Sequence, residues 1–211
     1  MSEEVFEPEL EPAEAKAIFG DRIDLARGYA EALVRDGNLL GLLGPRELPR
    51  LWTRHILNSA VVSELVPAGK TVADIGSGAG LPGIPMAICR PDNHFTLIEP
   101  MERRSDWLKE LVVELGLTNV TVLRARAEEV GEVFDIATAR AVSALPKLLR
   151  MVVPLVRDGG EVIALKGSKA AEEIEESKRL QKKLGLSGFE IVYAGKDVLA
   201  EPTLVVRTKL V

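Results

Sequence analysis

Four glycines stand close together in one segment of the chain, and a nucleoside cofactor could bind against them. The segment 72–83 runs from an apolar stretch into Gly76, Gly78, Gly80 and Gly83. Glycines let the backbone turn sharply and let a ligand lie against the bare main chain. Gly78, Gly80 and Gly83 also match the G-x-G-x-x-G pattern of dinucleotide sites, so NAD is one candidate.

Two carboxylates beside the glycines favour S-adenosylmethionine over NAD. Asp74 lies just before the first glycine, where it would oppose the anionic pyrophosphate of a dinucleotide and attract the ammonium and sulfonium of S-adenosylmethionine. Glu99 ends the next apolar stretch, 19 residues after Gly80. An acid at an offset of about 20 residues commonly accepts the ribose hydroxyls of a nucleoside. We therefore predict that Asp74, the glycine turn and Glu99 hold S-adenosylmethionine.

Cationic side chains could contact an anionic substrate. Arg140 lies just beyond the carboxyl end of a predicted strand, which is where ligands bind in open α/β sheets. Lys166 holds the matching place after the next strand, where it could contact a phosphate or a base, or could simply be solvated. Arg46, Arg50 and Arg54 recur every four residues. On a helix they share one face, which is either a phosphate-binding row or a solvated face.

The remaining reactive residue types indicate little further chemistry. Cys89 is the only cysteine and lies on an apolar helix face, so we predict an inert buried thiol and no intramolecular disulfide. The chain has two histidines and no Cys/His cluster of zinc-site spacing, so we predict no metal site. Aromatic residues make up 4% of the chain, which leaves base stacking to Trp52, a nearby arginine or a few other residues. Trp107 is predicted to lie in the core.

The spacing of apolar residues predicts the elements that position these side chains. Helical periodicity runs from residue 13 to Gly37, and a helix restarting at Pro45 carries His55 and ends near residue 66. After Gly69, short apolar stretches alternate with helical ones, which is the pattern of βαβ units. The predicted strands are 71–75, 95–98, 120–123, 134–137, 162–165, 189–194 and 204–210, the last two as an antiparallel pair. We predict an α/β fold, a doubly wound, mostly parallel seven-stranded sheet with an N-terminal helical cap.

Length, charge and composition are those of an ordinary globular chain. It has 211 residues, 46% hydrophobic and 28% charged, and a net charge of −5. Residues 1–24 hold eight acids against two basic residues, so the rest of the chain is close to neutral. We predict an acidic mobile tail (1–12), a helical cap (13–68) and a cofactor-binding domain (69–211). Neither a signal sequence nor an apolar run of ~18 residues is recognisable, so we expect a cytoplasmic protein without a membrane partner.

Short motifs give the chain a family resemblance. The run 74–80 resembles the first motif of Rossmann-like S-adenosylmethionine methyltransferases. Four further motifs are Arg-His-Ile-Leu-Asn-Ser at 54–59, Gly-Leu-Pro-Gly-Ile-Pro at 80–85, Ala-Arg-Ala at 139–141 and Ala-Leu-Lys-Gly at 164–167. In this order they are similar to those of the bacterial 16S ribosomal RNA guanine-N7 methyltransferases. The resemblance covers about residues 38–211. Asn58 stands where we expect Asp in many of these enzymes.

The resemblance implies a Rossmann-like methyltransferase fold with S-adenosylmethionine as cofactor. It implies cofactor contacts at Gly76, Leu81, Ala127, Glu128 and Arg140. It also implies catalytic, substrate-side roles for His55, Arg140 and Lys166. Together with Asp74, Gly78 and Glu99, these are the candidate site residues.

The implied reaction agrees with the residue types present. Guanine N7 has an in-plane lone pair that attacks a methyl sulfonium without losing a proton, so the enzyme needs positioning rather than a general base. Methylation of an exocyclic amine commonly uses an Asn/Asp-Pro-Pro-aromatic loop, but residues 138–142 read Thr-Ala-Arg-Ala-Val. N7 lies on the major-groove edge, which side chains cannot reach in A-form RNA, so the target guanine has to be unpaired.

The resemblance also implies a partner, which is small-subunit ribosomal RNA or the 30S subunit. No long exposed apolar stripe favours an obligate dimer, so we expect a monomer. Two alternatives stay open from the residues alone. The first is a methyltransferase of a small molecule, with the cap closing over its pocket, and the second is a nucleotide-binding module without enzymatic activity.

Overall fold

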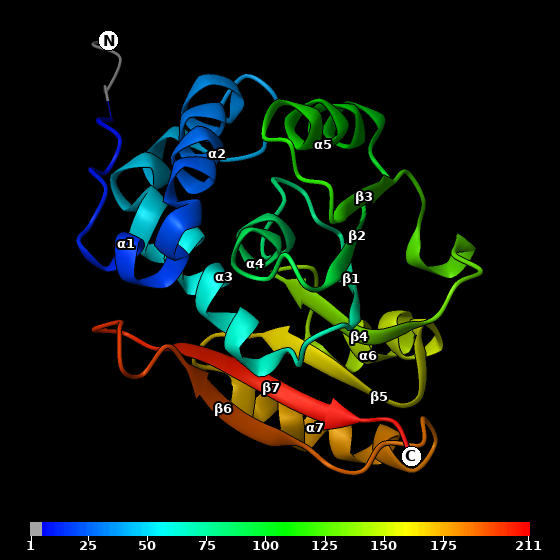
Figure 1. Ribbon diagram of the computed structural model, residues 1–211. Coiled ribbons are helices and arrows are strands. Elements are labelled where there is room, and N and C mark those ends of the chain that lie inside the picture. Colours follow the sequence, from blue (N-terminus) through cyan, green and yellow to red (C-terminus); the bar gives the residue numbers. More distant parts are fainter. Residues whose placement is uncertain (1–5) are drawn as a thin grey trace, which may run out of the picture.

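The strands of the protein form a single seven-stranded sheet. The computed structural model describes residues 6–211, and Figure 1 shows the sheet with helices on both sides. The strands are β1 (Thr71–Ile75), β2 (His94–Ile98), β3 (Val120–Leu123), β4 (Phe134–Arg140), β5 (Val156–Leu165), β6 (Glu190–Ala194) and β7 (Thr203–Lys209). Their order is β3-β2-β1-β4-β5-β7-β6, with β1 to β5 parallel and β7 antiparallel to both neighbours. The predicted doubly wound, mostly parallel sheet is confirmed.

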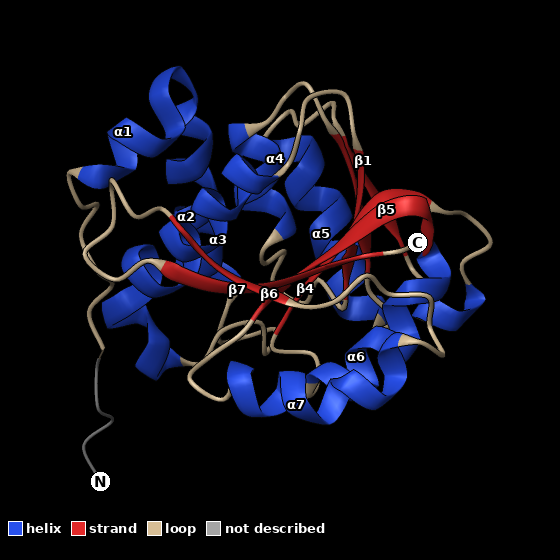
Figure 2. Ribbon diagram, turned by 90° about the horizontal axis from the view of Figure 1, so that it is seen from below, coloured by secondary structure: helices blue, strands red, loops and turns tan. Residues whose placement is uncertain are grey.

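Two layers of helices cover the sheet because its central strands are apolar on both faces. Neighbouring residues of β1 point to opposite sides, so Val72 packs in one core and Ala73 in the other. The cap, α4 (Gly83–Cys89) and α5 (Glu102–Glu114) cover the first face. The second face is covered by α6 (Leu145–Val152) and α7 (Ala170–Gln181) (Figure 2). The carboxyl ends of β1 to β5 meet at one edge between these layers, where a ligand can bind.

The cap is a succession of short helices of different kinds. Its elements are α1 (Glu14–Phe19), a 3₁₀ turn (Gly20–Arg22), α2 (Ile23–Asp36), a 3₁₀ helix (Pro45–Arg50), a π-helix (Leu51–Leu57), α3 (Asn58–Ala60) and a 3₁₀ helix (Val61–Leu65). The prediction of one regular helix from Pro45 to residue 66 is therefore wrong. Pro49 has no N–H to donate, and the winding changes from tight to wide just after it. None of the helices within residues 6–211 is long and apolar enough to cross a membrane.

This change of winding also corrects the predicted row of arginines. Arg46 and Arg50 lie in the 3₁₀ helix and Arg54 lies in the π-helix, so the three do not have the constant α-helical spacing that the prediction assumed. All three side chains are exposed.

Polar contacts fix the cap to the sheet and its helices. The buried hydroxyl of Tyr29 in α2 donates to the carbonyl oxygen of Ala79 at 2.8 Å. Arg22 Nε donates to the carbonyl oxygen of Ile88 in α4 at 2.7 Å. The cap therefore contacts the glycine turn directly through Tyr29.

The two tryptophans are both buried. Trp107 Nε1 in α5 donates to Asp36 Oδ2 in α2 at 2.9 Å, and its predicted place in the core is confirmed. Trp52 is only 5% exposed and belongs to the core of the cap. Of the residues considered for base stacking, Trp52 is therefore excluded, because its ring is already packed inside the protein. Cys89 is half-buried, and burial raises the pKa of its thiol to about 12, so it stays protonated at neutral pH.

Residues 6–12 lie along the cap. The N–H of Glu9 donates to the carbonyl oxygen of Leu48 at 2.8 Å, and the Glu11 carboxylate pairs with Arg27 at 2.6 Å. The first five residues of the predicted tail lie outside the described residues. The mobility of the tail and the division of the chain at residues 68 and 69 stay predictions.

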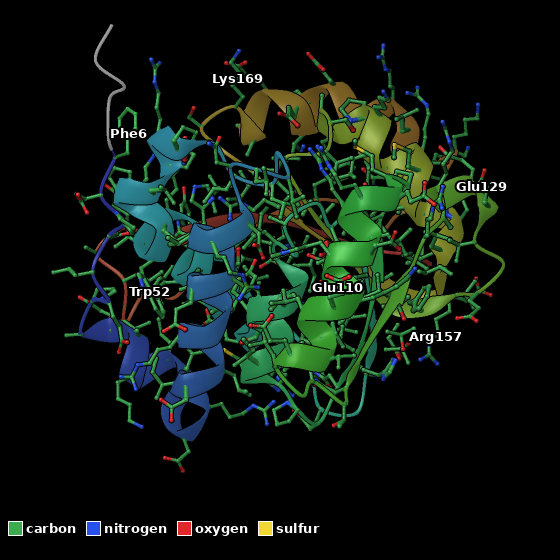
Figure 3. The ribbon with its side chains drawn as sticks, turned by 90° about the horizontal axis from the view of Figure 1, so that it is seen from above. Phe6, Trp52, Glu110, Glu129, Arg157 and Lys169 are labelled. Atoms are coloured by element: carbon green, nitrogen blue, oxygen red, sulfur yellow. The ribbon has the colours of Figure 1, made fainter. Side chains whose placement is uncertain are left out.

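The amino-terminal edge of the sheet carries a buried carboxylate. Asp135 of β4 accepts the backbone N–H and the hydroxyl of Thr71 at 2.9 and 3.0 Å, and it pairs with Lys70 and Arg157. Burial opposes ionisation of Asp135, but these bonds outweigh it and hold the pKa at about 2. Figure 3 places Arg157 on the side of the molecule away from Trp52 of the cap. Asp135 therefore stabilises the fold at a distance from the ligand edge.

We predict that Asp135→Asn lowers the free energy of unfolding at neutral pH by about 2 kcal/mol, since one pKa unit corresponds to about 1.4 kcal/mol. The ionised carboxylate stabilises the fold above its ordinary pKa of 3.8. That contribution is lost as the pH falls from about 4 to about 2. Urea unfolding at neutral pH and in this acidic range measures both effects, with exposed Asp158→Asn as the matched control. Equal stability of Asp135→Asn and the unmodified protein at neutral pH would contradict this account.

Candidate functional site

The glycine turn follows β1 and requires glycine at several positions. Gly76, Gly78 and Gly80 have φ angles of +67°, +56° and +87°, a region that other residues rarely adopt. Gly83 begins α4 against the sheet, and a β-carbon there would lie 2.3 Å from Leu97 Cδ2. At the carboxyl end of β1 the turn therefore has bare backbone that is half-buried at Gly76 and Gly78.

Asp74 lies fully buried beneath this turn. Its Oδ2 accepts the N–H of Gly83 at 3.1 Å, whereas its Oδ1 has no hydrogen-bond partner within residues 6–211. Burial raises the pKa of Asp74 to about 7, although the Ser77 hydroxyl and the Gly83 N–H oppose this shift. A buried carboxylate oxygen without a partner is costly and calls for a donor or a cation. A positively charged ligand group that reached this oxygen would therefore be stabilised.

Glu99 follows β2 and holds the turn from the other side. It is 3% exposed, and its Oε2 accepts the N–H of Gly78 at 2.9 Å. Its Oε1 accepts the N–H of Met101, also at 2.9 Å. These two bonds fix the carboxylate, and each oxygen keeps a further lone pair for a ligand hydroxyl.

The other predicted cofactor residues lie along the same edge of the sheet. Leu81 follows the glycine turn and is half-buried. Ala127 is buried and Glu128 is exposed in a 3₁₀ turn (Ala127–Glu129) that comes after β3. The structure thus places all three near the carboxyl ends of β1 to β3. Their contact with a cofactor stays a prediction.

Arg140 ends β4 and binds the cap. Its Nη1 donates to the carbonyl oxygen of His55 at 3.2 Å and to Ser59 Oγ at 3.1 Å. Its Nη2 donates to the carbonyl oxygen of Arg54 at 3.1 Å and to His55 Nδ1 at 2.9 Å. Burial lowers the pKa of this guanidinium, and the four bonds compensate for its lost hydration. The structure therefore brings together two predicted site residues, His55 and Arg140.

His55 links Arg140 to a carboxylate that the sequence analysis did not single out. Because Arg140 can only donate, Nδ1 of His55 accepts, and its Nε2 donates to Glu47 Oε2 at 2.7 Å. Burial lowers the pKa of His55, the charge of Arg140 lowers it further, and Glu47 opposes both. His55 is thus neutral at pH 7, with both ring nitrogens occupied. Glu47 also pairs with Arg50 at 2.6 Å, three residues away, which is an ordinary helical spacing. The contact of Glu47 with His55 spans eight residues, and no sequence pattern predicts it.

Lys166 lies just after β5 and is held in place by two groups. Its Nζ donates to the carbonyl oxygen of Ser143 at 2.7 Å and lies 2.9 Å from Glu173 Oε2. The Lys166 side chain is 9% exposed, so its interpretation as a solvated lysine is wrong. Glu173, in the first turn of α7, is a second site residue that the sequence analysis missed. It contacts Lys166 only because α7 folds back over the sheet.

A cleft of about 590 Å³ lies between the cap and the ends of β4, β5 and β7. Its lining includes Arg54, Asn58, Arg140, Lys166, Glu173 and Thr203. A second cleft of about 440 Å³ shares Arg54, Asn58 and Glu201 with the first and adds Arg50. The two clefts are therefore adjacent parts of one groove, in which the exposed guanidinium groups of Arg50 and Arg54 lie among the carboxylates of Glu14, Glu173 and Glu201.

The loop after β4 connects this cleft to the glycine turn. Ala141 has a φ of 55°, a left-handed conformation that costs energy for a residue with a β-carbon. This bend follows Arg140 directly. Val142 then packs on Gly76 so closely that a β-carbon on Gly76 would lie 3.0 Å from Val142 Cγ2. The cleft and the turn are thus neighbouring parts of one site.

Comparisons with known proteins support a methyltransferase interpretation of this site. A family model described as rRNA small subunit methyltransferase G matches residues 22–198. Two similar proteins are both called ribosomal RNA small subunit methyltransferase G. The one from Arthrobacter sp. (strain FB24) is 56% identical over 195 residues, which are 92% of this chain and 90% of that protein. The one from Paenarthrobacter aurescens (strain TC1) is 54% identical over 206 residues, which are 97% and 94%.

Solved structures show the same fold at much lower sequence identity. A SAM dependent methyltransferase from Aquifex aeolicus superposes with a TM-score of 0.56 at 19% identity. The superposition covers 76% of this chain and 93% of that one. It supports the Rossmann-like architecture of the sheet.

Proposed function

Because the chain belongs to the rRNA small subunit methyltransferase G family, we propose that it transfers the methyl group of S-adenosylmethionine to N7 of an unpaired guanine in 16S rRNA. The main structural support for this proposal is the contact of Val142 with Gly76. The loop that lines the cleft rests on the glycine turn, so a methyl donor on the turn and a base in the cleft share one wall. Family membership favours an rRNA acceptor over a small molecule or a nucleotide-binding module without activity.

The turn residues fit S-adenosylmethionine. The partnerless Oδ1 of Asp74 would be satisfied by a cationic group of the ligand. Glu99 is fixed by two backbone N–H groups and can still accept ribose hydroxyls. When bound, S-adenosylmethionine supplies an electrophilic methyl group on a positively charged sulfur. We assign to the same site Gly76, Gly78, Leu81, Ala127 and Glu128.

The substrate side of the site has to position the guanine rather than deprotonate it. N7 attacks with a lone pair and loses no proton, so no general base is required. The contacts of His55 are consistent with the absence of a general base, because Glu47 and Arg140 occupy both of its ring nitrogens. We therefore assign His55 to holding Arg140 in place. Arg140 and Lys166 line the cleft and are assigned to the substrate.

The groove suits the RNA strand on either side of an unpaired base. Arg50 and Arg54 are exposed in it, and guanidinium groups position nucleic acids through contacts to phosphates. An unpaired guanine is needed because side chains do not reach N7 in a regular A-form helix. We propose that the partner is small-subunit rRNA or the 30S subunit, and that the protein acts on it as a monomer in the cytoplasm.

Binding of S-adenosylmethionine should weaken as the pH falls. The cofactor's positive charge favours ionised Asp74, but its pKa of about 7 means that the buried group takes up a proton below neutral pH. The Kd measured by calorimetry is expected to rise about tenfold between pH 8 and pH 6. In Asp74→Asn this pH dependence should disappear. An unmodified protein with the same Kd at pH 6 and pH 8 would contradict the role of Asp74.

Methyl transfer tests the function itself. Labelled S-adenosylmethionine is incubated with small ribosomal subunits that lack their native N7 modification, and chemical cleavage at N7-methylguanine locates the product. We expect label at one loop guanine, with a rate that falls steeply with salt because RNA binding releases counterions. Absence of label on both subunits and extracted rRNA, with cofactor binding intact, would contradict the proposal and favour a small-molecule acceptor.

A further inference from the structure

A hydrogen-bond donor and an acceptor lie side by side on one wall of the cleft. Lys166 Nζ contacts Ser143 O and Glu173 Oε2, which leaves one of its three protons for a ligand. Glu173 Oε2 also accepts the N–H of Leu145 at 2.6 Å. In contrast, no hydrogen bond reaches Glu173 Oε1 from any residue between 6 and 211. Both side chains line the cleft.

This pair is fixed in position and in charge. Lys166 directly follows the end of β5 and Glu173 lies in the first turn of α7, so a strand end and a helix start anchor the pair. Burial opposes ionisation of Glu173, but Lys166 and the Leu145 N–H outweigh it and lower the pKa of the carboxyl group. At neutral pH the wall therefore presents an ammonium group that only donates next to a carboxylate oxygen that only accepts.

We propose that Lys166 and Glu173 select guanine by binding its base-pairing edge. This inference rests on the proposed function and adds the residues that determine its specificity. Guanine presents the O6 acceptor beside the N1–H donor, which complements an ammonium next to a free carboxylate oxygen. Adenine presents the reverse order, an amino donor at C6 and a lone pair at N1. Adenine would therefore place its amino donor against the Lys166 ammonium and its N1 lone pair against the Glu173 carboxylate. A site whose polar groups are left unpaired in this way rejects the ligand strongly.

The same contact explains why the target has to be unpaired. A guanine in a duplex uses O6 and N1–H for its partner base, so this edge is not available to Lys166 and Glu173. N7 lies on a different edge of the ring and stays free for the methyl donor. Recognition and reaction therefore use separate edges of one base.

The first test uses the unmodified protein and changes the substrate. Small subunits are reconstituted with guanosine, N1-methylguanosine or adenosine at the target position, and transfer to N7 is measured by mass spectrometry. We expect transfer to both replacements to be about 100-fold slower than to guanosine. N7 methylation of N1-methylguanosine at the guanosine rate would overturn the inference. A lack of transfer to guanosine would instead contradict the proposed function.

The second test changes the carboxylate. Glu173→Gln keeps the shape of the side chain and removes its charge, and the neighbouring exposed Glu172→Gln is the matched control. We expect Glu173→Gln to lower kcat/KM for guanosine about tenfold and to reduce the preference for guanosine over adenosine, while the Kd for S-adenosylmethionine stays the same. If Glu173 had a purely structural role, the substitution would lower kcat/KM for guanosine and for adenosine by the same factor. An unchanged preference in a folded Glu173→Gln variant would overturn the inference, and if the variant does not fold, the first test decides alone.

Discussion

A half-buried guanidinium group has to find acceptors for its N–H groups that face the protein, and in this protein that requirement joins the two parts of the site. Arg140 stands at the end of β4, and its acceptors are the carbonyl oxygens of Arg54 and His55, the hydroxyl of Ser59 and a ring nitrogen of His55. A buried donor without a partner costs about 1–3 kcal/mol, and more when it is charged. The cap is therefore held above the carboxyl edge of the sheet, and the cleft is the space that this arrangement leaves.

Charge is separated within the site according to what each half has to bind. The turn side carries the buried carboxylates of Asp74 and Glu99, which suit a cationic cofactor. The cleft side carries Arg54, Arg140 and Lys166, whose positive charges outnumber the negative charges of Glu173 and Glu201 and suit an anionic RNA strand. The short loop after Arg140 lies between these two halves, since Val142 packs on Gly76 while Ala141 and Ser143 line the cleft. A cationic donor and a polyanionic acceptor are thus both attracted to the place where they react.

Local sequence patterns predicted the sheet and the glycine turn well, because strand periodicity and positive φ angles leave direct traces in residue type. Asp74 and Glu99 were found because each lies at the end of an apolar stretch, which marks the carboxyl end of a strand. The mixed helices of the cap were not predicted, because a π-helix has no comparable signature. Glu47 and Glu173 were missed because they act through partners that only the fold brings close. Trp52 was misjudged since its burial depends on tertiary packing, to which its position in the chain gives no clue.

Arg140 holds the cap in place over the cleft, and hydrogen–deuterium exchange of an Arg140→Lys variant provides the sharpest test of this role. Lysine keeps the charge but cannot reach four acceptors with a planar fork. We expect faster exchange of the amides in residues 51–59, while those of β1 and the glycine turn exchange as in the unmodified protein. Unchanged protection of residues 51–59 in the variant would contradict it.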